Sequence, residues 1–120
     1  MAAGAFVISE LTEDEREVLR RGLLEWGGPA RCTEALAVAM DFGSVAALLK
    51  EGAHLADLIR DGQPLARRDW RRALVATEIV FADDVFGAGW DWQTTTGFTD
   101  EETIRILRSL QRKIAGVGRA

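Results

Sequence analysis

The sequence predicts an all-α fold: one compact bundle of about five helices, with a long tryptophan-containing loop before the last helix. Three observations lead to this prediction. A chain of 120 residues, 48% of them apolar, can bury one hydrophobic core of ordinary composition. The apolar residues recur at helical spacing along most of the chain. Capping sequences and glycine or proline stops then divide it into segments of helical length.

The first helix is expected to begin at Thr12. Its hydroxyl can accept from the backbone three residues later, while Glu15 reaches back to Thr12, as in a capping box. An apolar stripe continues to Trp26. Gly27-Gly28-Pro29 then ends the helix, because glycine accepts a left-handed cap and proline cannot continue a helix.

Two further helices are expected in the middle of the chain. One follows Thr33 and extends to Met40; it is apolar nearly all round, which predicts burial. Ser44 can cap the next helix, whose apolar stripe extends to about Arg60. A turn over 61–64 separates it from the following segment.

The longest helix is predicted over 67–86. It begins with basic residues around Trp70 and becomes apolar on most faces, so we expect it at the centre of the bundle. Gly87-Ala88-Gly89 should end it, and a connection of about ten residues leads to the final helix. Thr99 and Glu102 form a second capping box at the start of that helix.

We expect residues 1–120 to form one helical domain, with flexible tails at 1–9 and 116–120. No apolar run approaches the roughly 20 residues of a membrane helix, and no basic residue precedes the short apolar stretch near the N-terminus. A cytoplasmic location is therefore expected. The lone Cys32 agrees with a reducing compartment, and 13 arginines against two lysines suggest a bacterial source rich in GC.

The net charge of −4 is unevenly distributed. Residues 67–72 carry four basic groups and one acidic group, 73–102 carry seven acidic groups and no basic one, and 103–120 carry five basic groups and no acidic one. Such a chain lacks a continuous positive surface for the phosphates of duplex DNA. This charge distribution argues against a nucleic-acid partner and favours a basic protein partner.

The main candidate site is the connection 87–99 with the acids around it. Two rigid indoles beside several carboxylates are typical of a surface that docks a basic protein. The residues concerned are Asp83, Asp84, Trp90, Asp91 and Trp92. The alternative is that one or both indoles fold back to close the end of the bundle. A symmetric self-contact through exposed indoles is a further alternative.

Glu78 is a second candidate, because it lies within the most apolar helix. Burial would raise the pKa of its carboxyl unless a cation offsets the desolvation. We favour a structural ion pair with Arg71 or with an arginine of the last helix. The alternative is a small-molecule pocket between this helix and the 87–99 connection, lined by Glu78, Asp83, Asp84, Trp90 and Trp92.

Two weaker patterns suggest nucleic-acid binding. Residues 67–72 combine four arginines with Trp70, but these arginines can instead pair with the acidic first helix. The two helices joined through residues 41–44 have the spacing of a helix-turn-helix, yet the second helix exposes mixed charges. A helix-turn-helix regulator is therefore only the third function considered.

Catalytic and metal-binding patterns are sparse. Glu51-x-x-His54 is one copy of a motif that carboxylate-bridged metal bundles need twice, and Cys32 with His54 lacks an orienting third group. No cofactor or metal is expected, and a carboxylate-only enzyme is the remaining enzymatic alternative. The expected function is a non-enzymatic interaction module of the immunity, antagonist or adaptor kind, which docks a basic protein.

Overall fold

The structure, a computed structural model, describes residues 4–119 and confirms the all-α fold class. Its α-helices are α1 (Glu13–Leu24), α2 (Glu34–Ala39), α3 (Val45–Arg60), α4 (Arg67–Ala82), α5 (Trp92–Thr96) and α6 (Asp100–Ala115). Short 3₁₀ turns follow α1 (η1, Glu25–Gly27) and precede α5 (η2, Gly89–Asp91). The strands β1 (Ala5–Phe6) and β2 (Leu65–Ala66) pair antiparallel.

The predicted helix starts are confirmed by their caps. Thr12 accepts from the backbone N–H of Glu15 at 3.1 Å, while the Glu15 carboxylate accepts from the Thr12 N–H at 2.8 Å. The same reciprocal pair opens α6 at Thr99. Thr33 and Ser44 cap α2 and α3 through their hydroxyl groups. Local sequence therefore decides where these four helices begin.

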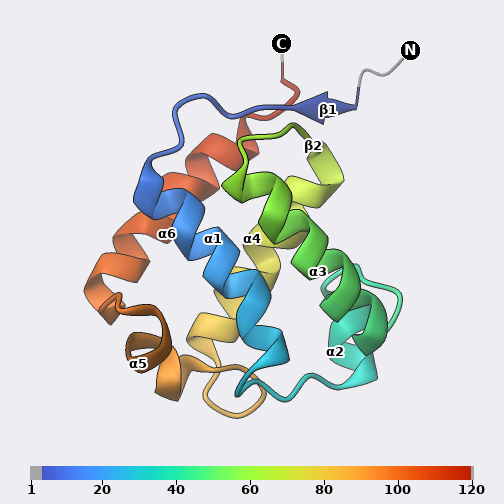
Figure 1. Cartoon of the computed structure of the whole chain (residues 1–120), viewed down its shortest axis with the longest axis vertical. Helices are drawn as coiled ribbons and strands as arrows, with labels where there is room; N and C mark the ends of the chain where they lie inside the picture. The colour runs from blue at the N-terminus through green and yellow to red at the C-terminus, as the bar shows by residue number, and fades with distance from the viewer. Residues whose placement is uncertain (1–3, 120) are drawn as a thin grey trace.

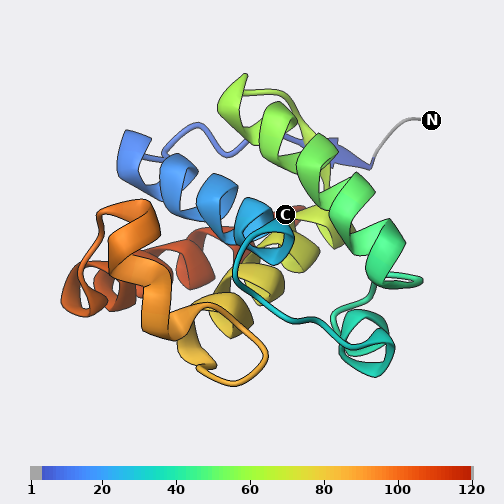
Figure 2. The ribbon, with the colours of Figure 1, turned by 60° about the horizontal axis from the view of Figure 1, so that its bottom comes forward.

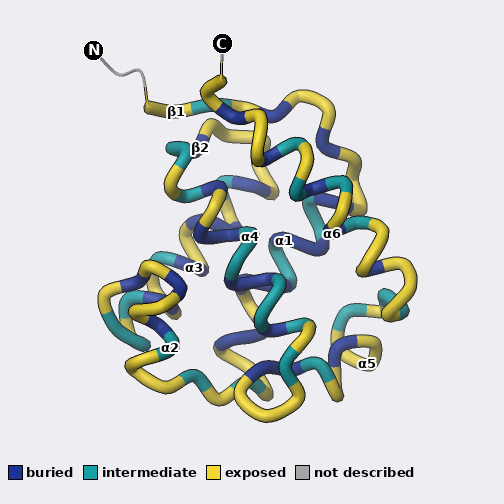
Figure 3. The backbone as a smooth tube through the Cα atoms, turned by 180° about the vertical axis from the view of Figure 1, so that it is seen from behind, coloured by how far each residue is buried: buried dark blue, intermediate teal, exposed yellow. Residues whose placement is uncertain are grey.

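The centre of the bundle is shared by two helices. In Figure 1, α1 and α4 lie side by side, with α3 on one side and α6 on the other. Helix α4 packs against α1, α3 and α6, as expected of a central helix, but α1 is equally enclosed. Figure 3 shows buried residues concentrated along these two helices. At their crossing Gly22 of α1 faces Thr77 of α4, and both are buried.

Helix α4 is shorter than predicted, because it ends at Ala82 and not at Phe86. Asp83 adopts an extended conformation, and its carboxylate accepts from the backbone N–H groups of Val85 at 2.7 Å and Phe86 at 3.0 Å. This side chain thus replaces the helical carbonyls as acceptor. Val85 and Phe86 consequently leave the core and lie on the surface.

Helix α2 also differs from its prediction. Of its six residues only Ala37 is fully buried, and Val38 is exposed. The helix packs on α3 at the edge of the bundle, so only one face is covered. An apolar composition all round the helix did not, in this case, mean burial on all sides.

The two ends of the described chain pack on the body of the protein. Ile8 and Val117 are buried, and the carbonyl of Phe6 accepts from the indole N–H of Trp70 at 3.0 Å. These contacts lie within the segments expected to be flexible tails, whose parts at 1–3 and 120 lie outside the described residues. No described helix is long and apolar enough to span a bilayer.

A buried ion pair joins α1 to α6. Glu15 is only 3% exposed and accepts from the ammonium of Lys113 at 2.7 Å. Burial by itself would raise the pKa of Glu15, but its hydrogen bonds and the nearby positive charge of Lys113 outweigh burial and leave the pKa below the ordinary value of 4.5. Folding thus stabilises the ionised form of this carboxyl.

We expect Glu15→Gln to lower the free energy of unfolding at neutral pH by about 2 kcal/mol, because Lys113 loses a charged partner. Since folding lowers the pKa of Glu15, its stabilisation is present at neutral pH and disappears as the pH falls through the folded-state pKa. The variant should therefore lose less stability than the parent as the pH falls through and below 4.5, the ordinary pKa of a glutamate. Urea unfolding at a series of pH values measures this difference.

The matched control is Glu101→Gln, which removes an exposed carboxylate 4.0 Å from Arg105. It should change stability little at any pH. Parallel pH profiles for Glu15→Gln and the parent would contradict the role assigned to this buried pair.

Candidate functional site

The candidate site is the segment from Asp83 to Asp91, which we call the acidic–aromatic loop. Backbone hydrogen bonds fix it at both sides: Ala88 donates to the carbonyl of Val80 at 2.7 Å, and Arg31 donates to that of Phe86 at 2.7 Å. Figure 2 brings forward the end of the molecule where the loop meets the α1–α2 connection. The loop is therefore attached to two separate parts of the chain.

Two glycines are required by the shape of the loop. A Cβ at Gly87 would lie 2.6 Å from the carbonyl oxygen of Asp83 and 2.7 Å from that of Val80. At Gly89 it would meet the carbonyl oxygen of Phe81 and, at 2.5 Å, the carboxylate of Asp84. These glycines act as more than the helix stop that the sequence indicated, because they allow backbone contacts that no other residue permits.

The two indoles of the predicted site have opposite environments. Trp92 is 0% exposed, donates its N–H to the hydroxyl of Thr103 at 2.8 Å, and packs edge-on against Phe81 at 5.6 Å between ring centroids. Trp90 is 85% exposed. The expectation that Trp92 belongs to a docking surface is therefore wrong, because interior packing occupies its ring and its N–H. Trp90 alone of the pair can reach a partner.

The acids of the loop have no ion-pair partner among residues 4–119. No basic nitrogen lies within 4.0 Å of the carboxylates of Asp83, Asp84 or Asp91 in this range. The backbone N–H groups of Phe86 and Val85 hold the pKa of Asp83 below its usual value. Arg31 approaches the loop through its backbone and makes no ion pair with it. The loop therefore presents negative charge that the described protein does not neutralise.

Apolar side chains lie among these acids. Val85 is 73% exposed and Phe86 is 43% exposed, in addition to Trp90. In Figure 3 the loop appears as an exposed segment at the lower end of the molecule. Sequence reasoning missed Val85 and Phe86 because it assigned them to the buried face of a longer helix. The adjacent Asp83 and Asp84 were the available signal, since acids are unfavourable at the negative end of a helix and favour turns.

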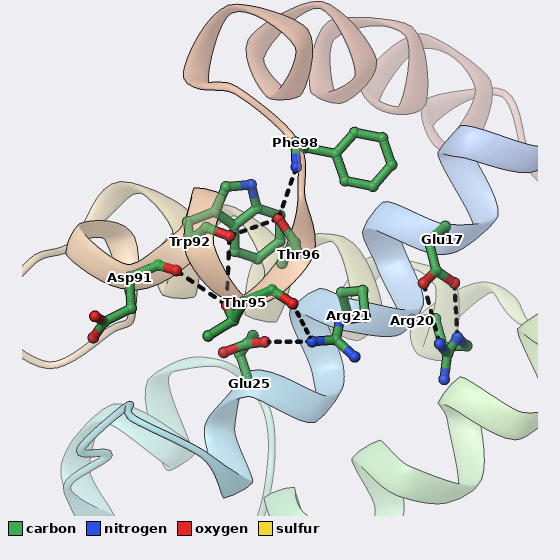
Figure 4. A network of polar contacts seen from close by, with 9 residues as sticks. All are labelled: Glu17, Arg20, Arg21, Glu25, Asp91, Trp92, Thr95, Thr96 and Phe98. Atoms are coloured by element: carbon green, nitrogen blue, oxygen red, sulfur yellow. Dashed lines mark hydrogen bonds and ion pairs between the residues drawn. The ribbon is translucent and has the colours of Figure 1, made fainter.

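An arginine of α1 anchors the far end of the loop. Figure 4 shows Arg21 between the carboxylate of Glu25 and the backbone of α5. It donates to the carbonyl of Thr95 at 2.5 Å and to Glu25 at 3.2 Å. The Thr95 hydroxyl in turn donates to the carbonyl of Asp91 at 3.1 Å. Trp90 and Asp91 are therefore held from both sides, by the end of α4 and by α5.

Glu78 belongs to a different surface. Its carboxylate accepts from the amide of Gln111 at 2.7 Å, and no arginine lies within ion-pair distance of it among the described residues. The expected ion pair with Arg71 or an α6 arginine is thus replaced by an uncharged partner, because Gln111 occupies the facing position on α6. Glu78 lines an open groove of about 290 Å³ between α4 and α6, together with Phe81 and Ile104. None of the tryptophans lines this groove, so the structure does not bring together the pocket expected from the sequence.

The arginine cluster, the helix-turn-helix pattern and His54 do not form a second site of the kind that the sequence suggested. Arg72 pairs with Glu51 and Asp69, and Arg68 pairs with Asp41, so these arginines do not pair with the acidic first helix as expected. Helix α2 has only six residues, and α3, the second helix of the helix-turn-helix pattern, packs its apolar stripe on α1. His54 is exposed. Within the described residues no three His, Cys, Asp or Glu side chains are grouped to hold a metal ion.

No protein-family model matches this chain, and neither a curated protein nor a solved structure shows significant similarity to it. The function of this chain is therefore inferred from its own geometry.

Proposed function

We propose that this protein is a non-enzymatic interaction module that docks a basic protein partner through the acidic–aromatic loop. The observation that carries the proposal is the exposure of Trp90. The indoles of Trp26, Trp70 and Trp92 are buried, and each donates its N–H to a protein acceptor. Trp90 is 85% exposed in a loop whose conformation is otherwise closely fixed. Tryptophan is the residue most enriched among the energetic centres of protein interfaces.

The charges around Trp90 favour a partner rich in lysine and arginine. Asp84 and Asp91 are exposed, and neither has an ion-pair partner in the described chain. Carboxylates at the edge of an aromatic contact attract a basic surface over a distance and disfavour acidic ones. The indole face can also accept a guanidinium or an ammonium group, which adds a cation–π contact.

The rigidity of the loop supports the same interpretation. Its backbone is bonded to Val80, Arg31 and, through α5, to Arg21. A surface that is already ordered loses little conformational entropy when it binds. The antagonist, immunity and adaptor classes all require such a surface, and the choice among them depends on the partner.

Substitution of Trp90 provides the direct test. Candidate partners are captured on the immobilised protein from a lysate of the source organism, and each basic protein retained is purified and titrated by calorimetry. We expect Trp90→Ala to raise the Kd by about tenfold or more, because a central aromatic anchor contributes upwards of about 1 kcal/mol. Val38→Ala, which truncates an exposed apolar residue on α2, is the matched control and should leave the Kd unchanged.

A comparison of two double variants tests the contribution of the loop carboxylates to partner binding. Asp84→Asn with Asp91→Asn should slow association and weaken its dependence on salt, because two attracting charges are removed. Asp14→Asn with Glu101→Gln removes the same charge from exposed positions on α1 and α6 and should have a smaller effect. The proposal is wrong if no purified basic protein distinguishes Trp90→Ala from the parent, or if both double variants behave alike.

A further inference from the structure

A pocket of about 350 Å³ lies between the end of α2 and the first two turns of α4. Four arginines of α4 line it together with a single carboxylate: Arg67, Arg68, Arg71, Arg72 and Asp41. Val75 and Ala39 contribute apolar wall. The volume lies within the range of small-molecule sites, and the charge of the wall is predominantly positive. This pocket shares no residue with the acidic–aromatic loop, so its function is independent of the proposed docking.

Two of the four arginines have structural partners. Arg68 donates to the Asp41 carboxylate at 2.7 Å. Arg72 is buried, pairs with Glu51 at 2.6 Å, and places its guanidinium 4.1 Å from the ring centre of Phe42. These contacts fasten α4 to α3 and to the α2–α3 turn. Arg68 and Arg72 therefore form a fixed wall of the pocket.

The other two arginines, Arg67 and Arg71, have no such role. Neither has a carboxylate within 4.0 Å among residues 4–119. They are four positions apart on α4, so their side chains leave the helix about 6 Å apart on one face. Arg71 is exposed and Arg67 is half-buried. Their two positive charges at the pocket are not neutralised by the described protein.

The position of Arg67 on α4 does not stabilise the helix. The first turn of a helix is the positive end of its dipole, where cations are unfavourable. Arg67 and Arg68 lie in that turn; the ion pair with Asp41 compensates Arg68, whereas Arg67 has no carboxylate within 4.0 Å among residues 4–119. A buried donor in the same wall, Nε of Arg72, also has no acceptor among the described residues. A ligand carrying negative charge would relieve the repulsion between these cations.

We propose that this pocket binds a small phosphorylated ligand, with the phosphate between Arg67 and Arg71. Planar guanidinium groups bind phosphate oxygens in pairs, and two such groups match the charge of a phosphate monoester. The uncharged part of the ligand would pack on the apolar wall at Ala39 and Val75. The pocket volume is only about 350 Å³, and the chain as a whole carries a net charge of −4. Both features favour a small ligand over a nucleic-acid strand, which needs a continuous positive track.

Phenyl phosphate, inorganic phosphate and a short single-stranded DNA oligonucleotide serve as probes, titrated by calorimetry at constant ionic strength. We expect phenyl phosphate to bind the parent protein more tightly than inorganic phosphate does, because only the former contacts the apolar wall. Arg67→Gln with Arg71→Gln should weaken phenyl phosphate binding by about tenfold or more. Arg71→Gln alone should weaken phenyl phosphate binding partially. Because Arg71 is exposed, this single variant replaces the double variant in the test if the double variant folds poorly.

The matched control is Arg105→Gln with Arg112→Gln, which removes the same charge from exposed positions on α6. This variant should bind phenyl phosphate like the parent. The proposal is overturned if both double variants lose binding equally, or if neither phosphate compound binds the parent at millimolar concentration. The oligonucleotide could also bind more tightly than phenyl phosphate and lose that binding in Arg67→Gln with Arg71→Gln. This result would overturn the proposal of a small ligand in favour of a nucleic-acid strand.

Discussion

Trp92→Ala is expected to lower the free energy of unfolding by about 3–5 kcal/mol, the cost of removing a large aromatic side chain from a packed core. The ring is 0% exposed, lies edge-on to Phe81 and donates to Thr103 at 2.8 Å. Its loss would leave a cavity between α4, α5 and α6 and would remove the donor to the Thr103 hydroxyl, which would keep only its bond to the carbonyl of Thr99 at 2.7 Å. Chemical denaturation of the purified variant measures this change.

Trp90→Ala is the matched control for Trp92→Ala, because it removes the same side chain two residues earlier. With 85% of Trp90 exposed, the substitution should change stability by less than about 0.5 kcal/mol. Comparable losses in the two variants would show that Trp90 is packed, and the docking surface would then lose its aromatic centre. The same pair of variants thus tests the fold and the premise of the proposed function.

Gly22→Ala should destabilise the protein by about 1–3 kcal/mol, although alanine normally favours a helix over glycine. A Cβ at this position would lie 2.5 Å from Cγ2 and 2.6 Å from Cβ of Thr77, and closer still to the hydroxyl oxygen. Thr77 is buried and donates to the carbonyl of Ala73 at 2.8 Å, so its short side chain has no free space to enter. Helices α1 and α4 would have to move apart at the centre of the core.

Gly52→Ala is the control for this prediction, since Gly52 is also a buried glycine within a long helix. The nearest atoms to its added Cβ, both of Leu23, are 3.8 Å away, which is ordinary contact. We expect Gly52→Ala to be neutral or to stabilise by up to about 1 kcal/mol through helix propensity. Adding Thr77→Gly to Gly22→Ala should recover part of the loss, as a double-mutant cycle would show. Equal effects at the two glycines would contradict the close helix crossing.

The helical segments followed from the sequence because their determinants are local. Thr12, Thr33, Ser44 and Thr99 cap the helices that were expected to begin there. The end of α4 was less predictable. An apolar pattern continues to Phe86, but the hydrogen bonds of the Asp83 carboxylate end the helix at Ala82. An apolar periodic pattern indicates which residues could be buried in a helix. The hydrogen bonds of a single side chain can nevertheless end the helix before the pattern ends.

The candidate site was predicted only in part. The acids at 83, 84 and 91 lie in one exposed loop with Trp90, as expected, whereas Glu78 lies in a separate groove and Trp92 lies in the core. Two tryptophans two residues apart look equivalent in sequence. They differ because the turn η2 and the short helix α5 direct one indole toward Thr103 and the other toward solvent.

The fold class, the starts of four helices and the grouping of charge along the chain all follow from the amino-acid order. These depend on contacts within a few residues, which a capping side chain or a spacing of apolar residues specifies directly. Three further features do not follow from it: which indole is exposed, which arginines are paired and where the two central helices touch. Those outcomes depend on contacts between residues far apart in the chain, such as Gly22 with Thr77 and Arg72 with Glu51. Such contacts arise only when whole helices pack.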